Sequence, residues 1–319
     1  MKIIEWLSDE MTRQLILPPM VAGLGVVLLC AVLSVLVVVK RMAFVGQGVA
    51  HSAFGGIGLA SVISVLLSAP AWAGHGSVFE LVVVVAFCVL TALGMASVAE
   101  RRGGAVQVDT GIGLFLVASM ALGALLVEAA RQIASAKGIP AATQPWESLL
   151  FGSILNASWS DALAALSIGS LVLLTLFLLR RGMLFYVTDE SAAEAFGLPV
   201  KLYRTALMVL LAIATVVAMR LTGVVLSSAL LVLPGAAALK LSRRLGVVML
   251  LACVLGVLGV LLGLTLSVQF NVQAGPCVVL VLTAFFGLSL LKPARIAPTA
   301  PTALAASGAA GESQAISPR

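Results

Sequence analysis

Long apolar runs without charge recur along the chain and are separated by short polar stretches. Seven such runs precede residue 245, and they are Met20–Val39, Met42–Ala69 (interrupted only by His51), Leu81–Ala99, Thr110–Val127, Ala162–Leu179, Thr205–Met219 and Leu221–Leu239. No charged residue occurs from Leu245 to Leu291, and the polar stretch Gln269–Pro276 divides this segment into two more runs. Because about 20 apolar residues cross the hydrocarbon core as a helix, the pattern predicts an all-α, polytopic integral membrane bundle with about eight or nine transmembrane helices.

The least certain pair of runs flanks Arg220. The run Thr205–Met219 is short for a membrane span. We expect a helix boundary at Arg220, so that the two runs form either two spans or a hairpin that does not fully cross.

Composition agrees with the pattern. The chain is 61% hydrophobic and 10% charged, whereas soluble domains carry roughly 25% charged residues. This excludes a soluble enzyme. The net charge of +6 does not indicate a nucleic-acid partner, because the basic residues occur at the ends of apolar runs. The four cysteines lie inside apolar runs without metal-binding spacing, so we expect no bound cofactor or metal centre from them.

The positions of lysine and arginine predict the orientation, because short cytoplasmic loops carry an excess of both. With the N-terminus outside and the C-terminus inside, thirteen lie on the cytoplasmic side, the last of them at the start of the tail: Lys40, Arg41, Arg101, Arg102, Arg180, Arg181, Lys201, Arg204, Lys240, Arg243, Arg244, Lys292 and Arg295. Five face outward, and they are Lys2, Arg13, Arg131, Lys137 and Arg220. Residues 1–292 are the expected membrane domain. Residues 293–319, rich in Pro, Ala and Ser, are the expected disordered cytoplasmic tail.

The sequence offers no obvious energy source for transport within this chain. The acidic residues lie in the expected loops, in the tail, or at the ends of apolar runs, as Glu80, Asp109, Glu128 and Asp161 do. Proton- and ion-coupled carriers usually hold ionisable groups within the bundle. The sequence has no Gly-Lys pair, which excludes a phosphate-binding loop of the Gly-x-x-x-x-Gly-Lys type. We therefore expect a non-catalytic chain driven by an external motor.

The longest inward segment, 180–204, predicts a docking point for such a motor. Thr188 can cap a short helix whose first turn carries Asp189 and Glu190. Gly197 is expected to end this helix. We expect an exposed apolar cluster of Ala192, Ala193 and Phe196; an ordinary solvated linker is the alternative.

Six segments occur in an order that is specific in combination: "VVVKRMAFVGQGVAHSAFGG", "VDTGIG", "LLFGSIL", "AAEAFGLPV", "LTGVVLSSALLVLPGAAA" and "GPCVVLVLTAFFGLSLL". Together they resemble the permease subunit of the bacterial ABC importers for zinc, manganese or iron, over nearly the whole chain up to Lys292. The resemblance implies a homo- or heterodimeric permease in the bacterial inner membrane, a cytoplasmic ABC ATPase dimer that uses ATP, and an extracytoplasmic metal-binding protein. It also implies that the stretch from Asp189 to Gly197 is the coupling helix, with Glu194, Ala195 and Gly197 as a reduced Glu-Ala-Ala motif.

By the same resemblance, His51, Gln47 and Asp109 are the candidate metal-contacting residues. His51 stands among small residues that let helices approach closely, and imidazole binds zinc and iron well. The family has aspartate where this chain has Gln47, and some zinc members have histidine where it has Val117. A structural role is the alternative for His51, as a buried hydrogen-bonded histidine, and for Asp109, as an ion-pair partner of Arg101 and Arg102.

We therefore expect a permease subunit that gives a divalent metal ion an alternating-access path driven by partner ATPases. One alternative is the same architecture moving a metal chelate or another small solute. A second alternative is a gradient-driven secondary carrier.

Overall fold

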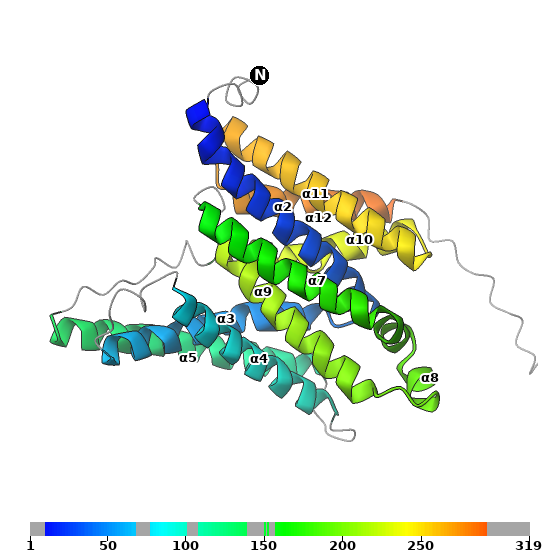
Figure 1. Ribbon diagram of the computed structural model, residues 1–319, viewed down its shortest axis with the longest axis horizontal. Helices are drawn as coiled ribbons and strands as arrows, with labels where there is room; N and C mark the ends of the chain where they lie inside the picture. Colours follow the sequence, from blue (N-terminus) through cyan, green and yellow to red (C-terminus); the bar gives the residue numbers. More distant parts are fainter. Residues whose placement is uncertain are drawn as a thin grey trace, which may run out of the picture.

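The described helices follow the apolar runs. The computed structural model describes residues 10–67, 77–100, 108–138, 150, 152 and 157–291, and the elements among them are α-helices (Figure 1). They are α2 (Glu10–Val39), α3 (Ala43–Leu66), α4 (Val78–Glu100), α5 (Val108–Ala136), α7 (Trp159–Thr188), α8 (Glu190–Ala195), α9 (Val200–Leu230), α10 (Leu233–Leu241), α11 (Leu245–Phe270) and α12 (Ala274–Leu290). The predicted all-α class is confirmed. The proposed tail at 293–319 lies outside the described residues.

Seven segments of the described chain are long and apolar enough to cross a membrane. They are Leu17–Val39, Ala43–Leu66, Val78–Val98, Thr110–Ala136, Trp159–Thr188, Val200–Leu241 and Leu245–Phe270, while Ala274–Leu290 is a shorter apolar helix. The prediction of a polytopic membrane bundle is confirmed. The number of crossings and the orientation stay predictions.

The break expected at Arg220 lies three residues later, at Gly223. Helix α9 continues through Arg220, and its backbone leaves the helical conformation at Gly223, where φ is 77° and ψ is 169°. Arginine is a good helix former, so Arg220 interrupts the apolar run without ending the helix. A Cβ on Gly152 would lie 2.4 Å from the backbone nitrogen of Gly223. Two glycines thus meet at the kink, where side chains would collide.

Helix α5 is longer than the apolar run 110–127 predicted. Helix α5 continues to Ala136, so Glu128 lies inside the helix instead of beside it. Glu128 and Arg131 form an exposed ion pair one turn apart, with a nitrogen–oxygen distance of 3.7 Å. This pairing lets the charged residues continue the helix.

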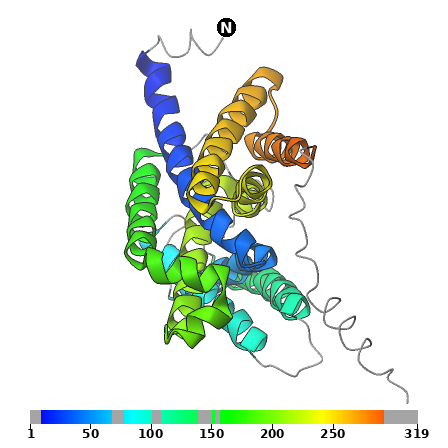
Figure 2. The ribbon, with the colours of Figure 1, turned by 90° about the vertical axis from the view of Figure 1, so that its right-hand side faces the viewer.

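The helices form two groups joined by α9. Helices α3, α4 and α5 pack together, while α2 packs on α7, α10 and α11. Helix α9 contacts α3 and α4 on one side and α2, α7 and α12 on the other (Figure 1). In the turned view of Figure 2, the group of α3 to α5 again lies below α11 and α12. The segment Val200–Leu241, which comprises α9 and α10, is accordingly the most buried of the candidate spans.

Candidate functional site

His51 and Gln47 lie one turn apart on α3 and therefore on the same face of that helix. Gln47 is exposed and His51 is half-buried. The Nδ1 atom of His51 is buried and has no hydrogen-bond partner among the described residues, and its ring stacks on Phe54 with centroids 6.3 Å apart. A buried ring nitrogen without a partner is costly. The alternative role for His51, a buried structural histidine held by hydrogen bonds, is therefore not seen at Nδ1 within the described part of the chain.

Small residues hold α3 tightly against its neighbours. A Cβ on Gly55 would lie 2.6 Å from the ring of Phe87 in α4, and one on Gly58 would lie 2.7 Å from the carbonyl oxygen of Gly123 in α5. Close contact of this kind between membrane helices is typical of small residues at interfaces. The face that carries His51 is therefore fixed relative to α4 and α5.

Asp109 belongs to the first turn of α5, which begins at Val108. Helices α3 and α5 run parallel, because Gly48 lies against Ile112 and Gly58 lies against Gly123. Asp109 therefore stands near the same end of the bundle as Gln47. Its side chain, like Arg101 and Arg102, lies outside the part of the chain that the structure describes.

The described side chains do not form a complete metal site. Within them, no three or more His, Cys, Asp and Glu residues gather closely enough to hold an ion. Val117 is exposed on α5, and it supplies no ligand. His51 and Gln47 thus place an imidazole and an amide on one helix face, and a metal site there would need further ligands.

Helix α8 is the short helix expected between two spans, but its cap is Asp189 and not Thr188. The Asp189 side chain accepts a hydrogen bond from the backbone nitrogen of Ala192 at 2.9 Å. Thr188 ends α7, where its hydroxyl donates to the carbonyl oxygen of Leu184. Helix α7 continues more than one turn beyond the apolar run Ala162–Leu179 and includes Thr188. The cap of α8 is therefore one residue later than predicted.

The C-terminal end of α8 follows the prediction. Gly197 adopts φ 75°, and Leu198 donates its backbone N–H to the carbonyl oxygen of Ala193 at 3.0 Å. A left-handed residue of this kind commonly ends a helix, and glycine adopts it without penalty.

The apolar cluster expected on α8 is only partly available. Ala193 is fully buried, so it packs on the protein and cannot meet a partner. Phe196 is 79% exposed, although one side of its ring lies against Phe185, with centroids 5.7 Å apart. Ala192 is half-buried and Glu194 is exposed. Helix α8 lies beyond the ends of α7 and α9 (Figure 1), so Phe196 and Glu194 form an accessible surface.

Sequence reasoning missed an ion-pair cluster at the base of α8. One carboxylate oxygen of Glu190 accepts from Lys40, and the other accepts from Arg204. Burial opposes ionisation of Glu190, but the hydrogen bonds and charges of both cations outweigh it, and the pKa of Glu190 is lowered. The only sequence signal was that all three residues were expected on the cytoplasmic side.

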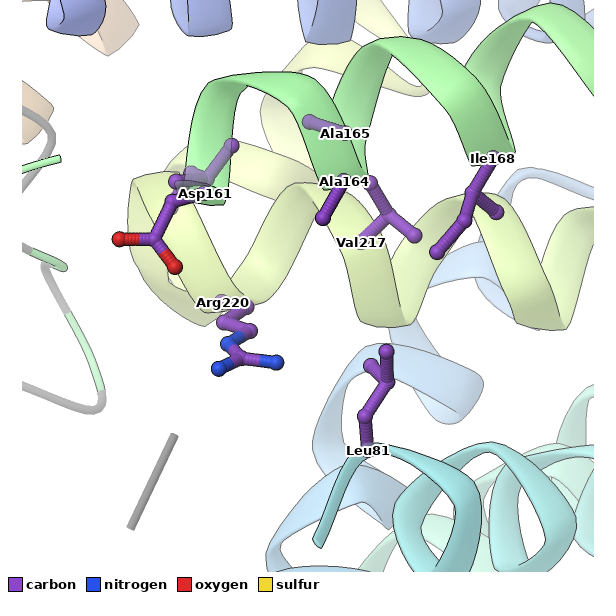
Figure 3. A pocket seen from close by; sticks show the side chains of 8 residues that line it. Leu81, Asp161, Ala164, Ala165, Ile168, Val217 and Arg220 are labelled. Atoms are coloured by element: carbon purple, nitrogen blue, oxygen red, sulfur yellow. The ribbon is translucent and has the colours of Figure 1, made fainter. Parts of the chain in front are cut away.

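A shallow pocket lies at the opposite end of the bundle (Figure 3). Its lining is mostly apolar, with Asp161 of α7 and Arg220 of α9 as its charged members, and the other residues are Leu81, Ala164, Ala165, Ile168, Val217 and Leu221. Asp161 also completes the cap of α7 with Ser158. A single carboxylate in the same pocket as a guanidinium is a poor cation site.

The two charged regions each join segments from different parts of the chain. Lys40, Glu190 and Arg204 bring the α2–α3 turn to the connection between α7 and α9. The pocket brings the start of α4 and the start of α7 to the turns of α9 around Arg220. Which of these two regions faces the cytoplasm stays a prediction.

Comparison with known proteins gives long matches. The sequence profile of the ABC 3 transport family matches residues 12–292. The manganese transport system membrane protein MntC of Halalkalibacterium halodurans is 32% identical over 268 residues, which are 84% of this chain and 84% of that protein. The probable iron transport system membrane protein of Haemophilus influenzae is 25% identical over 288 residues, or 90% of this chain and 97% of that protein.

A solved structure has the same architecture. A chain of PsaBC from Streptococcus pneumoniae, in complex with Fab, superposes with a TM-score of 0.72 at 25% identity, covering 93% of this chain and 96% of that chain.

Proposed function

This chain belongs to the ABC 3 transport family, and we propose that it is the membrane-spanning subunit of an ATP-driven importer for a divalent metal ion. Helix α8 is the observation that carries the ATP-driven part. It is a short helix between two spans, capped at both ends, and it presents an exposed phenylalanine beyond the bundle. A rigid protruding element of this kind suits docking to a cytoplasmic motor.

In this proposal, Asp189 to Gly197 is the coupling helix. Phe196 and Glu194, with Ala192 beside them, contact the ATPase, and Ala193 anchors the helix to the permease. Asp189 and Gly197 fix its two ends. The chain itself performs no bond chemistry, and ATP is hydrolysed by the partner dimer.

The proposed ion path runs along the face of α3 that carries Gln47 and His51. The Nδ1 of His51, which has no hydrogen-bond partner among the described residues, supports this path, because a metal ion would satisfy it. Gln47 offers an amide oxygen without negative charge, so the site holds the ion weakly and releases it easily. Asp109 and a second permease subunit, identical or related, supply the remaining ligands.

Manganese and iron are the proposed cargo to test first. Relatives named for manganese and iron transport cover most of the chain. Imidazole suits iron, and oxygen ligands such as an amide or carboxylate suit manganese. Zinc, which imidazole also binds, belongs in the same comparison.

The two alternatives predict different observations. A metal chelate would need a wider path, and its uptake would not depend on His51. A gradient-driven carrier would need ionisable groups deep in the bundle. Among the described side chains, the acidic ones inside spans are Glu80 and Asp161, both in first turns, and Glu128, about two turns from the end of α5.

The proposed assembly is a permease dimer in the bacterial inner membrane, with ATPases inside and a metal-binding protein outside. Metal accumulation in cells that carry this assembly tests the proposal, by elemental analysis for manganese, iron and zinc. ATP-dependent accumulation of one metal supports the proposal. No accumulation of any of the three metals contradicts it and favours a chelate or another solute.

A further inference from the structure

Glu190 joins three segments, one of which is distant in sequence from the other two. Its Oε2 pairs with Lys40, which lies 150 residues away in the turn between α2 and α3. Its Oε1 pairs with Arg204 in the first turns of α9. A single side chain on α8 is thus attached to both the α2–α3 turn and α9.

A buried tyrosine anchors the same cluster. Tyr186 in α7 is almost fully buried, and Lys40 Nζ lies 4.1 Å from its ring centroid. Lys40 also donates to the backbone oxygen of Tyr186 at 3.3 Å, and the Tyr186 side chain interacts with Arg204. Lys40 and Arg204 therefore both contact the buried Tyr186.

The helix cap does not require Glu190. Asp189 already provides the capping hydrogen bond at the start of α8. The side chains of Lys40 and Arg204 are only 15% and 22% exposed. Removing the Glu190 charge would leave two poorly solvated cations close together, which repel each other.

The turn that contains Lys40 is short. Helix α2 ends at Val39 and α3 begins at Ala43. Between them Arg41 adopts φ 59°, and Met42 donates its N–H to the carbonyl oxygen of Val37 at 2.9 Å. Because this turn is short and hydrogen-bonded, it connects Lys40 closely to the second and third turns of α3, where Gln47 and His51 lie.

We propose that Glu190 is a positioning residue that passes movement of α8 to α3 through Lys40 and to α9 through Arg204. This inference rests on the proposed function, since it requires an ATPase that moves α8. Its distinctive consequence is a loss of coupling: ATP is still hydrolysed, but less metal crosses for each ATP.

The test uses the full permease, reconstituted in proteoliposomes with the ATPase and binding protein of its transport system, and manganese ion as the probe. Manganese uptake and ATP hydrolysis are measured in the same vesicles. For Glu190→Gln we expect hydrolysis within about twofold of the parent and uptake per ATP lowered about tenfold, a factor typical of coupling between sites. Glu190→Asp should recover part of the coupling, because it restores the charge.

Lys40→Met and the double variant test the route. Lys40→Met should lower uptake per ATP as Glu190→Gln does, and the double variant should be little worse than Glu190→Gln alone, because both changes break one connection. Glu128→Gln is the matched control. It removes a carboxylate from an exposed ion pair in α5 and should leave uptake per ATP unchanged.

Unchanged uptake per ATP in Glu190→Gln would overturn the inference and leave the proposed function standing. A Glu190→Gln chain that fails to accumulate in the membrane, or loses hydrolysis and uptake equally, would indicate a folding or docking role and would also overturn it. A parent complex that takes up none of manganese, iron and zinc with ATP would overturn the proposed function and the inference together.

Discussion

Gly123 of α5 lies directly against the backbone of Phe54 in α3, so closely that a Cβ on Gly123 would come within 2.6 Å of the Phe54 carbonyl group. This contact sets the distance between α5 and the helix that carries His51. Backbone atoms cannot move aside as a flexible side chain can, so the position requires glycine.

Gly123→Ala should therefore destabilise the protein. We expect a loss of about 1–3 kcal/mol in the free energy of unfolding, which is typical of overpacking, seen as a lower melting temperature of the purified protein in detergent. Gly113→Ala is the control on the same helix, because a Cβ there meets nothing within 4 Å. Equal melting temperatures for the two variants would contradict the close packing of α3 on α5.

Gly197→Asp should uncouple the ATPase while the chain still inserts in the membrane. Gly197 has φ 75° and open space around it, so the penalty comes from the backbone, at about 1–2 kcal/mol for most residues and less for Asp, which tolerates the left-handed region better. Deletion of 192–196 should have the same effect more strongly.

The control for Gly197→Asp is Gly246→Asp in the first turn of α11. A Cβ on Gly246 also meets nothing within 4 Å, and its φ is not positive. ATP hydrolysis stimulated by the permease is the measurement. Equal stimulation of ATP hydrolysis by the two variants would show that α8 is not the coupling helix.

His51→Ala should abolish or strongly lower metal uptake, because it removes the imidazole whose Nδ1 has no partner among the described residues. The expected loss is about tenfold or more, comparable to the loss of a group that supports a metal site. His75→Ala removes the other histidine of the chain and is the comparison. Normal uptake by His51→Ala would exclude the α3 face as the ion path.

Gln47→Asp should tighten metal binding, because it places a negative charge one turn before His51. We expect a lower dissociation constant for manganese in the purified permease and slower release, so uptake falls at saturating metal. Gln47→Asn changes the length of the side chain without adding charge, and its affinity should stay near that of the parent. If both variants bind manganese equally, Gln47 does not face the ion.

Periodicity alone predicted most of the fold, because membrane spans depend on long apolar runs. It failed where a charged residue continues a helix. Arg220 and Glu128 interrupt apolar runs, yet α9 and α5 extend through them. The break in α9 depends instead on Gly223 and its contact with Gly152, which no local pattern reveals.

The candidate site was only partly predictable. Glu190 was recognised as a first-turn residue of a short helix, but its pairing with Lys40 joins positions 150 residues apart. Such pairing depends on how α2, α7 and α9 pack. The burial of Ala193 on the inner face of α8 has the same origin, whereas exposed Phe196 was expected from the local sequence.

The most direct test of the central claim is manganese uptake into proteoliposomes that contain this permease, with and without its ATPase, at equal ion gradients. We expect uptake only when the ATPase, ATP and the binding protein are all present, and no change when the membrane is made permeable to protons. Uptake by the permease alone that follows a proton gradient would contradict the account and identify a gradient-driven carrier.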